Sequence, residues 1–172
     1  MPVIRNVKLL EDYNNLESGF FLCLIGTSKI PPHIALIANG KYYSTSVKGV
    51  KLGVDFNFLL KILETKKTPT LFLKIDELID QPQLTEVYAN YPKLTTNESC
   101  LFPIRDYFKL KNWKVDNWAF VFDLIGDLLI KDKIEIAYHL RMEELLENES
   151  FKLREYTKED IITLIKELKA LC

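Results

Sequence analysis

The sequence predicts an α+β fold, with a small antiparallel β-sheet meandering near residues 20–75, packed helices, and a mostly helical C-terminal half. Two short apolar runs, 20–25 and 33–38, are bounded by glycine or proline, as buried strands are. Asn39-Gly40 follows the second run and is typical of a type I′ hairpin turn, because both central positions of that turn need a positive φ. After residue 100, apolar side chains instead recur at helical spacing.

The first half of the chain holds the remaining predicted strands. Residues 1–15 fit either an edge strand or a short helix. Residues 41–47 are rich in aromatic and β-branched side chains and form the return strand of the hairpin. Asp55 is placed to cap a helix whose apolar face ends before Thr68-Pro69, and residues 70–75 then form another strand.

The middle of the chain is polar and rich in proline. Residues 76–99 contain Pro82 and Pro92 and are predicted to form a short helical piece and a long loop. A helix then runs from Ser99-Cys100 to about residue 109. Pro103 is compatible only with its first turn, so Cys100 lies at or just before the start of that helix.

Two further helices are predicted in the C-terminal half. Asp116 is the expected cap of one helix, and Thr157, followed by acidic residues, begins the last one close to a capping box. Residues 134–138 fit either a strand or the start of another helix. The apolar stripe of the last helix consists of Ile161, Ile165, Leu168 and Leu171.

Composition indicates one domain spanning residues 1–172, without a global electrostatic field. The 172 residues include 48% hydrophobic and 27% charged residues, which is ordinary for a globular protein. Lys plus Arg number 23 against 24 for Asp plus Glu, so no nucleic-acid partner is expected, and segment 105–114 is the only candidate for one. No leader pattern or transmembrane segment is recognised, and a cytoplasmic location is predicted.

The cysteines and histidines offer few sites for chemistry. Cys23, Cys100 and Cys172 make an odd set without a CxxC pair, which argues against a disulfide framework or a zinc site, and no cofactor is predicted. Cys100, at a predicted helix start, is placed where backbone N–H groups lower a thiol pKa. His33 begins a strand, where its side chain is able to reach a site. Cys23 and His139 are interpreted as structural.

Three segments carry a family resemblance. Residues 16–25, the hairpin around Asn39-Gly40 that begins at His33, and Gly49-Val50 resemble the opening of papain-like NlpC-type hydrolases of circularly permuted topology. That group includes lecithin retinol acyltransferase-like proteins. Its members tend to begin with a "GD" strand, followed by an "sHvGi" hairpin and a "GV". The nucleophile comes later, at a helix start, and Cys100 has that position and order here.

The resemblance implies a Cys-His hydrolase or acyltransferase acting on an amide or ester. Cys100 would attack the carbonyl, His33 would serve as general base and then acid, and backbone N–H groups at the helix start would bind the oxyanion. Ser44 stands where an acidic residue often orients the imidazole, and would take that role. The substrate, whether a small molecule, a peptide or a lipid, is not specified.

Other interpretations stay open. The "GD" acid is replaced by Phe20, which leaves room for a non-catalytic relative. The runner-up function is a protein-interaction module, adaptor-like or immunity-like. Its surface would use any exposed members of an aromatic group that otherwise belongs to the core: Tyr88, Tyr91, Phe102, Tyr107, Phe108, Trp113 and Trp118. If these two residues are structural rather than catalytic, His33 is a turn residue and Cys100 is a small buried hydrophobic residue.

Overall fold

A seven-stranded sheet organises the molecule, and the computed structural model describes residues 1–171. Its strand order is β2 (Val7–Leu9), β8 (Ile134–Leu140), β7 (Thr70–Ile75), β3 (Phe20–Ile25), β4 (His33–Ala38), β5 (Lys41–Ser46) and β6 (Gly49–Asp55). All neighbours are antiparallel except β2 and β8, which are parallel. β1 (Val3–Ile4) pairs with β9 (Phe151–Lys152) in a separate two-stranded sheet. The predicted α+β class, with its antiparallel meander and helical C-terminal half, is confirmed.

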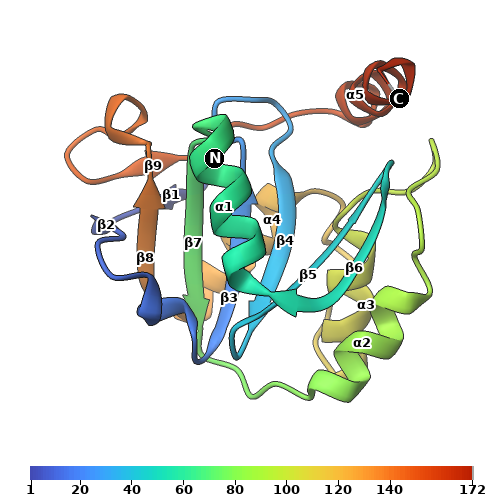
Figure 1. The fold of residues 1–172 in the computed structure, drawn as a ribbon, viewed down its shortest axis with the longest axis horizontal. Coiled ribbons are helices and arrows are strands. Elements are labelled where there is room, and N and C mark those ends of the chain that lie inside the picture. The colour runs from blue at the N-terminus through green and yellow to red at the C-terminus, as the bar shows by residue number, and fades with distance from the viewer. Residues whose placement is uncertain (172) are drawn as a thin grey trace.

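Helices cover both faces of the sheet (Figure 1). α1 (Phe56–Lys66) lies in front of the sheet in this view, and α4 (Val121–Ile130) lies behind it. α2 (Gln81–Ala89) and α3 (Phe102–Leu110) lie beside the β5–β6 end, and α5 (Lys158–Ala170) projects at the edge of the molecule. The sheet lies between these helices and divides the core into two main apolar layers.

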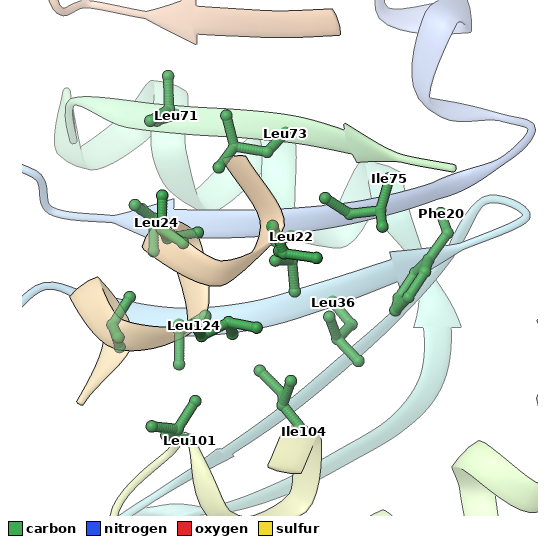
Figure 2. Packing of buried hydrophobic residues seen from close by; sticks show 14 of the residues in the cluster. Phe20, Leu22, Leu24, Leu36, Leu71, Leu73, Ile75, Leu101, Ile104 and Leu124 are labelled. Atoms are coloured by element: carbon green, nitrogen blue, oxygen red, sulfur yellow. The ribbon is translucent and has the colours of Figure 1, made fainter. Parts of the chain in front are cut away.

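Successive side chains of β3 and β7 point to opposite faces of the sheet, so each strand contributes to both layers. Phe21, Cys23 and Phe72 point toward α1. The intervening residues point toward α3 and α4, where Leu124 and Ile104 pack over them (Figure 2). Both faces of the central strands are therefore buried, which explains why their sequences read as continuous apolar runs.

The predicted hairpin forms as expected. Asn39 and Gly40 have φ values of 47° and 75°, the left-handed conformation that a type I′ turn requires. The turn places β5 beside β4, and the ladder pairs Leu36 with Tyr43. This register brings β5 side chains next to the start of β4.

Several element predictions need correction or resolution. Residues 1–15 form two short strands and a 3-10 helix, Tyr13–Leu16, rather than one element. The fourth strand of the meander, β6, was not predicted. The helix expected to start at Asp116 begins only at Val121, because Asp123 turns back to accept hydrogen bonds from the N–H groups before it. Residues 134–140 are a strand.

The helix caps at Asp55 and Thr157 are confirmed. Asp55 accepts a hydrogen bond from the Asn57 N–H, and Thr157 and Asp160 form a reciprocal capping box at the start of α5. Of the predicted stripe on α5, Ile165 is buried whereas Leu171 is 82% exposed. No helix within residues 1–171 is long and apolar enough to cross a membrane.

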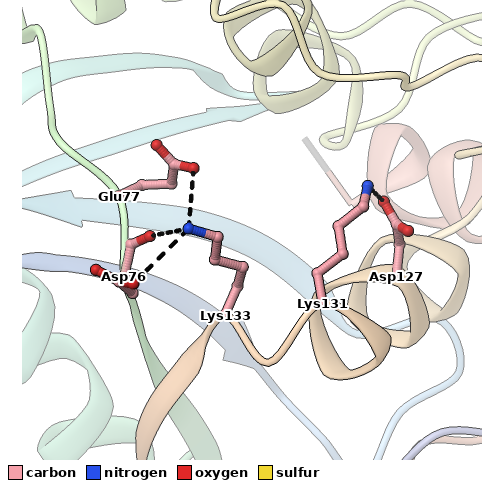
Figure 3. A network of polar contacts seen from close by, with 5 residues as sticks. All are labelled: Asp76, Glu77, Asp127, Lys131 and Lys133. Carbon is pink, nitrogen blue, oxygen red and sulfur yellow. Dashed lines mark hydrogen bonds and ion pairs between the residues drawn. The ribbon is translucent and has the colours of Figure 1, made fainter.

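Ion pairs join the β7–β8 end of the sheet at the surface (Figure 3). Lys133 lies 3.7 Å from Asp76 and 3.8 Å from Glu77, and Lys131 lies 2.6 Å from Asp127 one helical turn earlier. Exposed pairs of this kind contribute about 0–1 kcal/mol each. They position loop ends rather than carry the stability of the fold.

Candidate functional site

Cys100 lies immediately before α3, next to the first residues of β4. Its Sγ atom accepts a hydrogen bond from the backbone N–H of Ile34, at 3.5 Å. Because Ile34 follows His33 in the chain, this contact seats the thiol beside the start of the strand that carries the candidate imidazole. The predicted position of Cys100, at or just before the helix start, is correct.

His33 is the first residue of β4, as predicted, and it is hydrogen-bonded to Ser44. The Nε2 atom of His33 lies 2.7 Å from the Ser44 Oγ atom, and Ser44 is only 5% exposed. A short contact of this kind fixes the ring's orientation. The structure therefore brings together His33 and Ser44, the residue at the place where the resemblance expects an acid.

His33 and Cys100 line the same cavity, which has a volume of about 220 Å³. Its wall is built from six parts of the chain: the segment before β4, the end of β5, the loop around Leu94, the start of α3, the start of α4, and α5 with the preceding Tyr156. Two of the three predicted site residues thus open onto one cavity, and Ser44 supports one of them from the side.

Both groups are neutral near neutral pH. Burial raises the pKa of the Cys100 thiol above its ordinary value of 9.0, and the hydrogen bond from the Ile34 N–H opposes that shift only in part. Burial also lowers the pKa of His33 from 6.5 to about 4. Within residues 1–171, no hydrogen bond joins the Cys100 thiol to the His33 ring. The arrangement is a thiol beside a neutral imidazole rather than an ion pair.

The expected thiolate at a helix N-terminus is not found. α3 begins at Phe102, two residues after Cys100. The N–H of Leu101 donates to the Ser99 Oγ atom at 3.2 Å, and the N–H of Phe102 donates to the Ser99 carbonyl at 3.0 Å. These donors are already paired, so they neither stabilise a thiolate nor stand free for an oxyanion, and burial determines the pKa of the thiol.

The remaining candidates are structural. Cys23 is fully buried in β3, where burial raises its pKa. His139 is 5% exposed in β8, and its Nδ1 atom has no hydrogen-bond partner. Cys172 lies outside the described residues. Most of the aromatic group is core, since Tyr88, Tyr107, Phe108 and Trp118 are buried, and Tyr91, Phe102 and Trp113 are half-buried.

Sequence reasoning missed the residues that close the cavity. Leu94 comes from the loop predicted as irregular, and Phe120 and Tyr156 come from segments without a motif. The Tyr156 hydroxyl accepts a hydrogen bond from the N–H of Val121 at 3.0 Å and so ties the segment before α5 to the start of α4. No local pattern marks such a residue, because its role depends on two distant segments meeting.

No cluster of three metal-ligating side chains occurs among residues 1–171. Comparison of the chain with protein-family models, with curated proteins and with solved structures gives no match in any of the three.

Proposed function

We propose that the chain is a cysteine-dependent hydrolase or acyltransferase acting on an ester or amide, with Cys100 as nucleophile and His33 as general base. The supporting observation is the hydrogen bond from Ile34 to Cys100, which seats the thiol beside His33 in one cavity. A nucleophile and a base on separate elements, converging on a shared cavity, are the minimum that acyl transfer needs.

Both groups are neutral at pH 7, so the proposed reaction starts from a thiol and a free imidazole. As the Cys100 sulfur forms a bond to the substrate carbonyl carbon, its proton passes to the free ring nitrogen of His33. That proton then goes to the departing alcohol or amine as the carbonyl–heteroatom bond breaks. Water, or an acceptor alcohol or amine, then gives a proton to His33 as its oxygen or nitrogen bonds to the thioester carbonyl carbon. That proton passes to the Cys100 sulfur as the carbon–sulfur bond breaks, and the acid, ester or amide is released. Ser44 acts as a positioning residue, because it holds Nε2 and leaves Nδ1 as the working nitrogen.

The proposed reaction requires a movement of the imidazole toward the thiol when substrate binds. Catalytic hydrogen bonds are often long or misaligned without substrate and tighten in the complex. The half-buried His33 ring lines the cavity, so a substrate occupying that cavity contacts both groups.

Intact-mass spectrometry on a panel of p-nitrophenyl esters and anilides tests the proposal. The native protein is expected to release nitrophenol or nitroaniline and to carry a transient acyl mass, and Cys100→Ala is expected to lose both. Cys23→Ala, which removes the fully buried thiol of β3, is the matched control and should keep both. Turnover that survives Cys100→Ala, or an absence of turnover and acyl mass across the panel, would refute the catalytic role.

A second candidate, a non-catalytic binding module, is favoured by one observation. The N–H groups of Leu101 and Phe102 are paired with Ser99, so these two donors are not free to form an oxyanion hole. A protein with that arrangement would use the cavity to bind rather than to react. A native protein that binds a ligand in this cavity but forms no acyl mass would favour this alternative.

A further inference from the structure

The cavity beside Cys100 is lined mainly by apolar side chains. Leucine, isoleucine, valine and proline side chains make more than half of the wall, and α5 contributes four of them. The wall residues that carry polar side-chain atoms are His33, Ser46, Lys48, Ser99, Cys100 and Tyr156. A ligand that fills this space meets hydrocarbon on most sides.

The polar groups of the wall are largely engaged with the protein itself. His33 is bonded to Ser44, and the Ser99 hydroxyl accepts from the Leu101 N–H. The Ser46 hydroxyl accepts from the Lys48 N–H at 3.2 Å and lies 3.4 Å from the Gly49 carbonyl. A polar chain, such as a peptide backbone, would lose its hydrogen bonds to water without finding partners here, at a large cost.

Helix α5 forms the roof of this cavity. Ile161, Leu164, Ile165 and Leu168 all line it, and they lie on one face of the helix because they are three or four positions apart. Ile165 clusters with Val47 and Leu94 rather than with the main layers of the core. The opposite face, which includes Thr163 and Lys166, is exposed, and α5 stands away from the sheet in Figure 1.

We infer that the cavity under α5 is a binding site for an unbranched aliphatic chain, such as a fatty acyl group, with α5 as its lid. The apolar wall disfavours polar chains, and Lys48, which lines the cavity and is exposed to solvent, offers an ammonium group to a carboxylate or an anionic headgroup. The inference does not depend on catalysis. The same chain would be the acyl part of a substrate if Cys100 reacts, and a bound lipid if it does not.

The helix is suited to move because one face alone holds it, with Ile161, Ile165 and Leu168 packed against the core clusters. Among its residues only Ile165 is buried, and the connecting residues Arg154 and Glu155 are exposed. Tyr156 marks the fixed end, since its hydroxyl is bonded to Val121. Opening between Tyr156 and Thr157 would admit a chain without disturbing the sheet, and closing would bury the chain against α5.

Titration calorimetry with a series of aliphatic ligands tests this inference. Affinity is expected to rise at least about tenfold from butyrate to octanoate, because each buried methylene adds favourable transfer free energy. Binding should carry a negative heat-capacity change, the mark of apolar burial. A glycol ether of matched length is the polar control and should not bind. Methyl octanoate, titrated in parallel, shows whether the cavity binds the aliphatic chain as an ester or as the free acid.

Two matched lysine substitutions on α5 separate the lid from general effects on the helix. Ile165→Lys places a charge in the cavity and should weaken octanoate binding at least about tenfold. Thr163→Lys adds the same charge on the exposed face and should leave binding within about twofold. Circular dichroism confirms that both variants are folded.

Octanoate has no bond that Cys100 could cleave, so its binding to the native protein tests this inference separately from the proposed catalysis. Octanoate binding without any turnover of the ester panel would support this inference while the proposed function fails. The inference is overturned if neither octanoate nor its ester binds the native protein. It is equally overturned if affinity ignores chain length, or if the two lysine variants weaken binding alike.

Discussion

The imidazole of His33 and the hydroxyl of Ser44 lie 2.7 Å apart on adjacent strands, β4 and β5. The tight turn at Asn39-Gly40 sets the pairing of these strands and so brings the two side chains together. A local signal near the tip of the hairpin thereby determines a contact near its base. The stability, pH response and activity of the protein should all depend on that contact.

Replacing Ser44 with alanine is expected to destabilise the fold by about 1–3 kcal/mol, because the buried Nε2 atom of His33 loses its partner. If the chain is an enzyme, turnover should also fall by about one to two orders of magnitude, as the imidazole loses its orientation. Urea unfolding measures the first effect. Ser28→Ala, at an exposed serine, is the matched control and should change neither quantity. A stability unchanged by Ser44→Ala would mean that water or another group replaces the hydroxyl.

The stability of the native protein is expected to fall as the pH is lowered from about 6.5 toward 4. Burial lowers the pKa of His33 from 6.5 to about 4, so between these values the unfolded chain binds a proton that the folded chain does not. The loss amounts to at most about 3 kcal/mol from this group, and it is complete below pH 4. Well above pH 6.5 His33 is neutral in both states and contributes no slope.

The His33→Gln variant should flatten that dependence, and unfolding at a series of pH values measures it. His139 titrates in the same direction, because burial lowers its pKa as well, and a residual slope in His33→Gln is therefore expected. His139→Gln gives the reciprocal comparison. A native-like slope in His33→Gln would show that His33 is solvated well enough to titrate normally.

Local signals in the sequence were enough to predict much of the fold. The hairpin turn, the apolar runs of β3 and β4 and the caps Asp55 and Thr157 each depend on residues close together in the chain. Strand β6 was missed because its residues are only partly buried or exposed and two glycines interrupt it, so no apolar alternation marks it. Strand β8 was ambiguous because its apolar residues alternate over a short run that also suits a helix.

The candidate site was predictable only in part, and by a different route. His33 and Cys100 were candidates from their predicted places at a strand start and a helix start, and Ser44 came from the resemblance to a family. The structure brings His33 and Cys100 to one cavity. The raised pKa of Cys100 was not foreseen, since burial depends on segments such as that around Leu94 and α5, far away in the chain. Helix dipoles can be inferred from a local sequence, but burial by distant elements cannot.

Alkylation of Cys100 by iodoacetamide is expected to be slow at pH 7 and to accelerate only above pH 9. The thiolate is the reactive form, and burial raises the pKa of this thiol above 9.0. His33→Ala should change the rate at pH 7 by less than about threefold, because a neutral imidazole does not stabilise a thiolate. Mass spectrometry of digested protein resolves the three cysteines. Rapid alkylation at pH 6 that His33→Ala abolishes would instead reveal a thiolate–imidazolium pair.

Substitutions in α4 and α5 should separate the rigid core from the lid. Leu124→Ala removes a fully buried side chain packed over the central strands and is expected to lower the free energy of unfolding by about 2–5 kcal/mol. Ile165→Ala removes an equally apolar side chain, but its neighbours are the few residues of a small cluster beside a cavity, so the expected loss is below about 1.5 kcal/mol.

Native-state hydrogen exchange gives the complementary measurement. The amides of α5 should exchange through a local opening that Ile165→Ala accelerates, while those of β3 exchange only on global unfolding. Protection of α5 equal to that of β3 would show that the helix is part of the core and leaves the cavity without a movable roof.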